Sequence, residues 1–156
     1  MEKNNPPRSF GVFKPVGHTV IAFAGVDAME AAAKSLLEQG FAAPDLVRYT
    51  PYEMKAQVEA DLLTASPIAA VGQELNLVKT HQALAADGCS FLVVHAPDDA
   101  QAERVDAVLR ANHATSAQRY GSFMIEELID QPVGETQVFE SPDRGLDVAV
   151  AAAPPR

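Results

Sequence analysis

Cysteine is almost absent from this sequence, in which Cys89 stands alone. A single cysteine cannot form an internal disulfide, so a small secreted scaffold held together by disulfides is excluded. Because Cys89 begins an apolar run, we expect a buried and unreactive thiol.

Basic residues are also scarce, with 12 Lys and Arg against 21 Asp and Glu and a formal net charge of −9. Nucleic acid and anionic membrane surfaces are bound by clustered Lys and Arg, and here the basic residues are scattered singly. We therefore expect neither nucleic acid nor a membrane as a partner.

Long apolar runs are missing as well. The longest, such as residues 19–26, have the length of a strand and fall far short of the roughly 20 residues of a spanning helix. The first residues, MEKNNPPRSF, hold no apolar stretch of the kind found in a signal peptide. These features predict a cytoplasmic protein.

The apolar content is nevertheless enough for one folded domain, because 47% of the 156 residues are hydrophobic. A chain of this length buries roughly 70% of its unfolded surface. We expect an N-terminal arm over residues 1–17, an α/β core over residues 18–130 and a C-terminal tail over residues 131–156. Two alternating segments around a Pro-Asp-x-Gly turn predict a hairpin in the tail.

Four strands are predicted in the core. Residues 18–25 and 89–96 are apolar on both faces, which is typical of strands at the centre of a sheet. Residues 45–50 alternate as an edge strand does. Residues 116–128 hold the last strand, with Phe123 among its apolar positions.

Helices are predicted between the strands from their start signals, which place a capping side chain or a proline at the first turn. These starts are Asp27 with Glu30, Thr50 with Pro51 and Glu53, Ser66 with Pro67, and Asp98. The resulting order is β-α-β-(α-α)-β-α-β.

This order favours an α+β fold, the ferredoxin-like split-βαβ sandwich, with a helical pair inserted between strands two and three. We expect the strands around Phe23 and Val93 to lie side by side and parallel at the sheet centre. The helices would then cover one face. A flavodoxin-like three-layer sheet is the alternative.

Parallel central strands would bring residues 25–27 and 95–99 together at one edge of the sheet. Two helix N-termini at that edge suggest a site for phosphate, but Asp27 and Asp98 are expected to cap those helices themselves and to repel an anion. No glycine-rich phosphate loop is present.

The residues proposed to bind a ligand are Arg48, Tyr49, Tyr52 and His95. Arg48 would hold a carboxylate in a groove beside the inserted helices. The alternative is that Tyr49 and Tyr52 attach the helix start to the sheet. His95, at the end of a strand, is either a general base, a pH-sensitive latch or a hydrogen-bonded core histidine.

The sequence nominates no catalytic residue and no metal ligand set, and it leaves the cofactor unknown. Cys89 has no evident base partner, and no serine stands in a nucleophile elbow. Glu74 and His81 are spaced to share one helix face, where a surface position is expected because nothing supplies two further metal ligands.

Several segments carry a resemblance over about residues 10–129: FKPVGH, Gly40-Phe41, RYTPYEM, HAPDD and RYGSFMIEEL. In these segments the chain resembles small bacterial α/β proteins of unknown function and is loosely similar to the heat-induced general stress proteins. The resemblance implies the fold class and a bacterial cytoplasmic setting, and it assigns no catalytic residue.

The expected function is that of a non-enzymatic, homo-oligomeric module with a stress-related or regulatory role. This follows from the missing catalytic constellation and from two apolar terminal extensions that a small core has little room to cover. The alternative is a small enzyme or ligand-binding protein with a pocket between the sheet and the helical insert.

Overall fold

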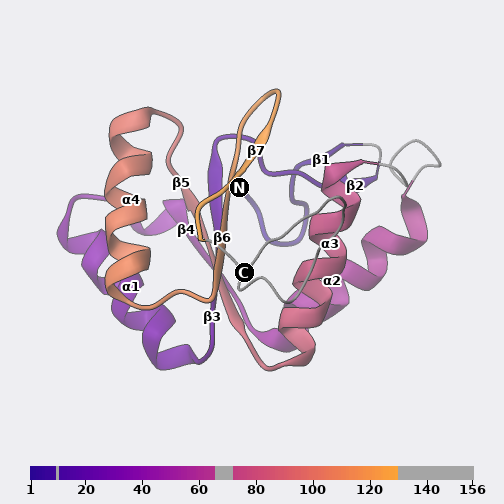
Figure 1. Cartoon of the computed structure of the whole chain (residues 1–156), viewed down its shortest axis with the longest axis horizontal. Helices are drawn as coiled ribbons and strands as arrows, with labels where there is room; N and C mark the ends of the chain where they lie inside the picture. The colour runs from indigo at the N-terminus through magenta and orange to yellow at the C-terminus, as the bar shows by residue number, and fades with distance from the viewer. Residues whose placement is uncertain (10, 66–71, 130–156) are drawn as a thin grey trace, which may run out of the picture.

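The fold is a mixed α+β sandwich of three layers (Figure 1). The computed structural model describes residues 1–9, 11–65 and 72–129. A five-stranded sheet with the order β4-β5-β3-β6-β7 forms the middle layer, and all neighbouring strands run antiparallel. Its strands are β3 (His18–Phe23), β4 (Leu46–Tyr49), β5 (Ser90–His95), β6 (Ser116–Tyr120) and β7 (Ile125–Glu127).

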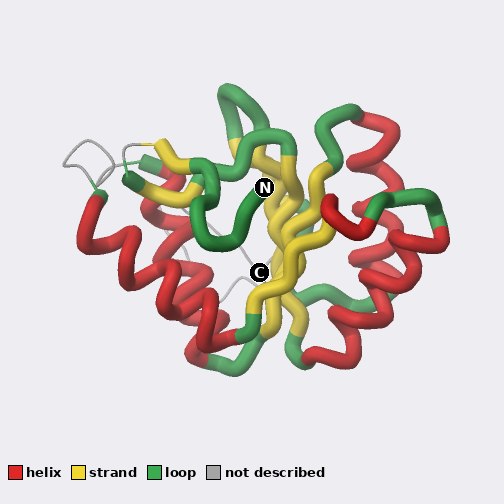
Figure 2. The backbone as a smooth tube through the Cα atoms, turned by 180° about the vertical axis from the view of Figure 1, so that it is seen from behind, coloured by secondary structure: helices red, strands yellow, loops and turns green. Residues whose placement is uncertain are grey.

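Helices cover both faces of this sheet, as Figures 1 and 2 show from opposite sides. The crossover helices α1 (Val26–Glu38) and α4 (Asp99–Ala111) share one face. The inserted helices α2 (Pro51–Thr64) and α3 (Gln73–Ala86) cover the other. A short 3₁₀ turn, η1 (Ala43–Asp45), leads into β4. The two apolar faces of β3 and β5 explain this arrangement, because each face needs its own layer of helices.

The central strands β3 and β5 are neighbours, as expected, but the prediction that they run parallel was wrong. His18 lies opposite His95, and Phe23 lies opposite Ser90. The reason is the number of helices in each connection. One helix, α1, returns the chain so that β4 runs like β3, whereas two helices, α2 and α3, return it to the end where β4 stops. Strand β5 must therefore run against both.

The antiparallel direction separates the two segments that were expected to meet at one edge. Residues 25–27 lie at the end of the sheet where β5 starts, and residues 95–99 lie at the opposite end. Of the two capping predictions, the one for Asp98 is confirmed and the one for Asp27 is wrong. Asp98 caps α4 by accepting the Gln101 N–H at 2.8 Å, but α1 is capped by Gly25, and Asp27 only lies in its first turn.

The N-terminal arm packs on the chain's own inserted helices. Its strands β1 (Arg8–Ser9) and β2 (Val12–Phe13) form a small antiparallel ribbon. Val12 and Phe13 are buried in the core cluster that α2 and α3 share with the sheet. Val12 and Phe13 are therefore covered within the same molecule.

The last predicted strand is in fact a hairpin, in which β6 turns back into β7. The turn closes with the Gly121 N–H donating to the Met124 carbonyl at 2.9 Å. Phe123, predicted as an apolar position of the strand, sits in this turn with its side chain fully exposed. The helix start at Ser66-Pro67 and the predicted tail hairpin lie outside the described residues.

None of the helices in the described ranges has the length and the apolar character needed to cross a bilayer. Cys89 is buried, as predicted, and burial raises the pKa of its thiol. His81 was expected at the surface and is instead buried in the core. Its Nε2 lies 3.0 Å from the Gln118 Oε1.

Candidate functional site

Arg48 and Tyr49 lie at the junction of β4 and α2 and point to opposite faces of the sheet. This follows from the alternation of side chains along a strand. The Arg48 guanidinium holds the Glu30 carboxylate of α1 through two contacts, Nε to Oε2 at 2.8 Å and Nη2 to Oε1 at 3.1 Å. The carboxylate that Arg48 holds belongs to the chain itself, whereas the prediction concerned the carboxylate of a ligand.

Tyr49 is buried on the α2 and α3 face, where it belongs to the core cluster. Burial, the largest influence, raises the pKa of its phenol to about 12, so the hydroxyl is a proton donor at neutral pH. That hydroxyl has no hydrogen-bond partner among the described residues. Tyr52, by contrast, begins α2 with 80% of its surface exposed, so it does not attach the helix to the sheet.

A cavity of about 330 Å³ lies between the N-terminal arm and α2, and Tyr49 and Tyr52 both line it. We name this cavity the arm cleft. Lys3 and Arg8 of the arm line it as well. A second cavity of about 230 Å³ shares Lys3, Tyr49 and Glu53 with it, and Arg48 lines this second cavity.

His95 lies apart from these three residues. Tyr49 pairs with Phe91, four positions before His95 on β5, a separation of about 13 Å along a strand. The His95 ring packs against that of His18 with centroids 4.8 Å apart, and its Nδ1 is 3.6 Å from the Asp45 carboxylate. The structure thus brings Arg48, Tyr49 and Tyr52 together and leaves His95 out.

The cations of the arm cleft were missed in the sequence because they come from the arm. Lys3 contacts Glu53 across 50 positions, and Arg8 contacts Asp61 across 53. A spacing so large has no local pattern to reveal it. The one available signal was the presence of three cations, Lys3, Arg8 and Lys14, among the apolar and proline residues of an arm expected to pack.

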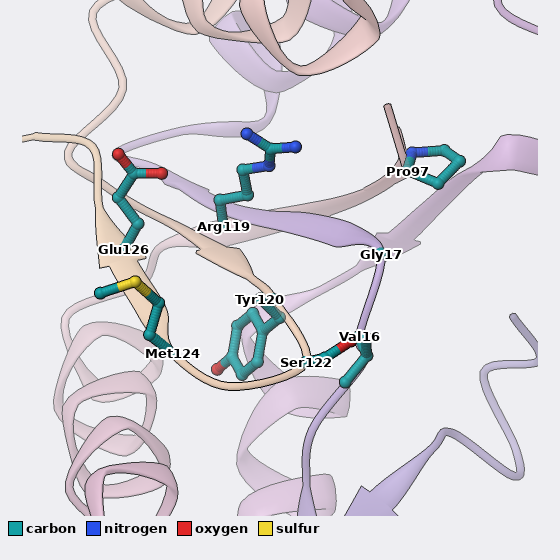
Figure 3. A pocket seen from close by; sticks show the side chains of 9 residues that line it. Val16, Gly17, Pro97, Arg119, Tyr120, Ser122, Met124 and Glu126 are labelled. Atoms are coloured by element: carbon teal, nitrogen blue, oxygen red, sulfur yellow. The ribbon is translucent and has the colours of Figure 1, made fainter. Parts of the chain in front are cut away.

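A cavity of about 320 Å³ is lined by residues of the β6–β7 hairpin, both from its strands and from its turn (Figure 3). Val16, Pro97 and Met124 supply apolar walls. Arg119 and Glu126 point to the same side from paired positions on β6 and β7, as Figure 3 shows. Arg119 also bonds Asp99 at the start of α4, at 2.8 Å.

Apolar side chains crowd the exposed tip of this hairpin. Phe123 is fully exposed, Met124 is 69% exposed and Val16 is 43% exposed. Water-exposed apolar groups gathered around a hollow are typical of surfaces that bind another protein. We name the surface formed by Val16, Phe123, Met124 and the neighbouring cavity the hairpin tip.

Within the described residues, no three His, Cys, Asp or Glu side chains group closely enough to hold a metal ion.

Comparison with known proteins found no matching family model, no matching curated protein and no matching solved structure.

Proposed function

We propose that this chain is a non-enzymatic binding module that self-associates through the hairpin tip. One observation carries the proposal: Phe123 is fully exposed in a turn whose neighbouring residues, Ser122 and Met124, line a cavity with apolar walls. A two-fold interface joins one surface patch to a second copy of itself. A projecting ring next to a hollow meets that requirement, because each copy offers both the group to insert and the space to receive it.

The burial of Phe123 alone does not supply the free energy that a stable dimer needs. Burying a phenylalanine contributes about 1.5–3 kcal/mol, and a symmetric interface counts it twice. A dissociation constant of about 1 μM needs about 8 kcal/mol after the costs of association. Met124 and Val16 add apolar area, and the outer edge of β7 carries no further strand among the described residues. An unpaired edge can pair with the same edge of a second copy.

We further propose that the scaffold is a ferredoxin-like split-βαβ sandwich. The strand order supports this, because β5 lies between β3 and β4 while β3 lies between β5 and β6. The helical pair α2–α3 is then an insertion that closes the second face. A stress-related or regulatory role in the bacterial cytoplasm is proposed from the resemblance of the motifs alone.

Light scattering tests the self-association. The wild-type chain should give about twice the mass of the 16.6 kDa monomer at about 100 μM, a concentration that would fill an interface of micromolar affinity. Phe123→Ser should reduce the mass to that of the monomer. Leu63→Ser is the matched control, because Leu63 is 88% exposed on α2 and lies outside the hairpin tip.

A monomeric wild-type chain at that concentration, or equal loss of mass in the two variants, would contradict the proposal. Far-ultraviolet circular dichroism of both variants checks that they fold. Their substitutions lie at exposed positions, where little cost in stability is expected.

A further inference from the structure

The arm cleft holds an excess of hydrogen-bond donors. Lys3 and Arg8 bring two positive charges, and Tyr49 and Gln57 add a hydroxyl and an amide. The carboxylates nearby are already engaged by the backbone. Glu53 accepts the Thr50 N–H at 3.0 Å.

Asp61 does not line the cleft, but it is engaged in the same way and contacts Arg8 and Gln57, which do. It is 1% exposed and accepts the Phe13 N–H at 3.0 Å. Gln57 and Arg8 donate to its other oxygen at 3.0 and 3.1 Å. Both oxygens of the Asp61 carboxylate are therefore engaged in contacts that hold the arm in place.

The Tyr49 hydroxyl is the unexplained group of this region. It is buried without a partner among the described residues, and such a group costs about 1–3 kcal/mol. Tyr49 is itself one of the residues that line the arm cleft, together with Lys3, Arg8 and Glu53. A ligand that accepted its hydrogen bond would remove that cost.

We propose that the arm cleft binds a small organic anion, a carboxylate or a phosphate ester. The acidic group accepts hydrogen bonds from the Tyr49 hydroxyl and from the Lys3 and Arg8 cations. The apolar part of the molecule lies against the exposed ring of Tyr52. This site is independent of the hairpin tip, since it uses a different cavity and different residues.

Access to the hydroxyl requires the Lys3 side chain to move. Its ammonium bonds Glu53 at 3.0 Å and lies 5.4 Å from the centre of the Tyr49 ring. The side chains of this ion pair are 36% and 40% exposed. An exposed pair contributes about 0–1 kcal/mol, so an entering anion can replace Glu53 as the partner of Lys3.

Isothermal titration calorimetry with benzoate and with phenyl phosphate tests the site. At least one of the two should bind the wild-type chain, and the stronger of them identifies the acidic group. Tyr49→Phe should weaken that binding about tenfold or more, because a hydrogen bond to a charged group contributes about 1.5–3 kcal/mol. It removes only an unpartnered hydroxyl, so its melting temperature should equal or exceed that of the wild type.

Tyr120→Phe is the control, since Tyr120 is buried on the same face of the sheet and does not line the arm cleft. It should leave binding unchanged. Two results would overturn the proposal. In the first, neither probe binds the wild-type chain at about 10 mM, a concentration far above the dissociation constant of a useful site. In the second, Tyr49→Phe binds the better probe as well as the wild type does.

Discussion

Asp61 shows how one buried side chain fixes the position of a whole segment. It lies on α2, and through its contact with the Phe13 N–H it holds β2 against the core. Burial is the largest influence on its carboxyl and raises its pKa, although three donors oppose that shift. A buried charge is tolerated when all its oxygens are engaged.

Asp61→Ala should therefore destabilise the protein. It leaves the buried Phe13 N–H without a partner, which costs about 1–3 kcal/mol, while water can serve the partly exposed Arg8. Urea denaturation measures the loss. Asp106→Ala is the control: it breaks an exposed pair with Arg110 and should cost less than about 0.5 kcal/mol. Equal losses in the two variants would contradict this account of the arm.

His81 gives a prediction about pH. Burial lowers the pKa of its imidazole, so the folded chain keeps it neutral. Below about pH 6.5 the unfolded chain takes up a proton that the folded chain does not. The free energy of unfolding should then fall on acidification, by up to about 1.4 kcal/mol per pH unit from this group.

The measurement compares the wild type with His81→Gln in urea between about pH 7 and pH 5, the range in which free imidazole titrates. Glutamine cannot titrate, so the variant should show the shallower dependence. Other groups with shifted pKa values, such as His18 and Glu127, remain in both proteins and cancel in the comparison. The same slope in both proteins would show that His81 is not the source.

At the scale of elements, Gly11 decides how the arm turns onto α2. Its φ is +83°, and a Cβ there would lie 2.3 Å from the Thr64 carbonyl oxygen. Gly40 shares the left-handed conformation with φ +100°, but a Cβ there meets nothing within 4 Å. Comparing substitutions at the two glycines therefore separates the cost of the left-handed backbone from the cost of a steric clash.

Gly11→Ala should cost clearly more stability than Gly40→Ala. Both substitutions cost about 1 kcal/mol because of the left-handed conformation. Only Gly11→Ala also places a Cβ against the Thr64 carbonyl, which displaces the arm from α2. Thermal unfolding gives the difference, and limited proteolysis within residues 1–17 should be faster in the first variant alone. Equal behaviour of the two variants would argue against tight packing of the arm.

Local signals predicted the elements well. The Thr50–Glu53 capping box is present, with both of its hydrogen bonds at 3.0 Å, because residues three apart determine it. The apolar runs around Phe23 and Val93 identified two neighbouring strands. Their relative direction was mistaken, since it depends on counting the helices of both connections rather than on any residue in the strands.

The candidate site was predicted less completely for the same reason. Arg48, Tyr49 and Tyr52 are close in sequence and stay close in space, whereas His95 was included on the assumption of a shared edge that the antiparallel sheet removes. Lys3 and Arg8 were missed because their contacts join residues that are 50 and 53 positions apart in the sequence. Phe123 was assigned to a strand because the pattern of residues 116–128 did not reveal a turn.

At the scale of the whole molecule, the two proposed binding surfaces, the arm cleft and the hairpin tip, lie on different parts of the fold. The arm and the inserted helices close one face of the sheet and enclose the arm cleft. The β6–β7 hairpin projects at the other end of the sheet and leaves its apolar tip in water (Figure 1). With a net charge of −9, two copies repel one another, so an apolar contact must supply the attraction.

Site-specific crosslinking tests the hairpin tip most directly. Ser122 stands beside Phe123 in the turn, so Ser122→Cys in a Cys89→Ala background places one reactive thiol on the proposed interface of each copy. A short bismaleimide should then yield a covalent dimer, and adding Phe123→Ser should abolish it. The control Lys55→Cys, on an exposed position of α2, should give none. Crosslinking that is equal at both positions, or absent at Ser122, would contradict self-association through this surface.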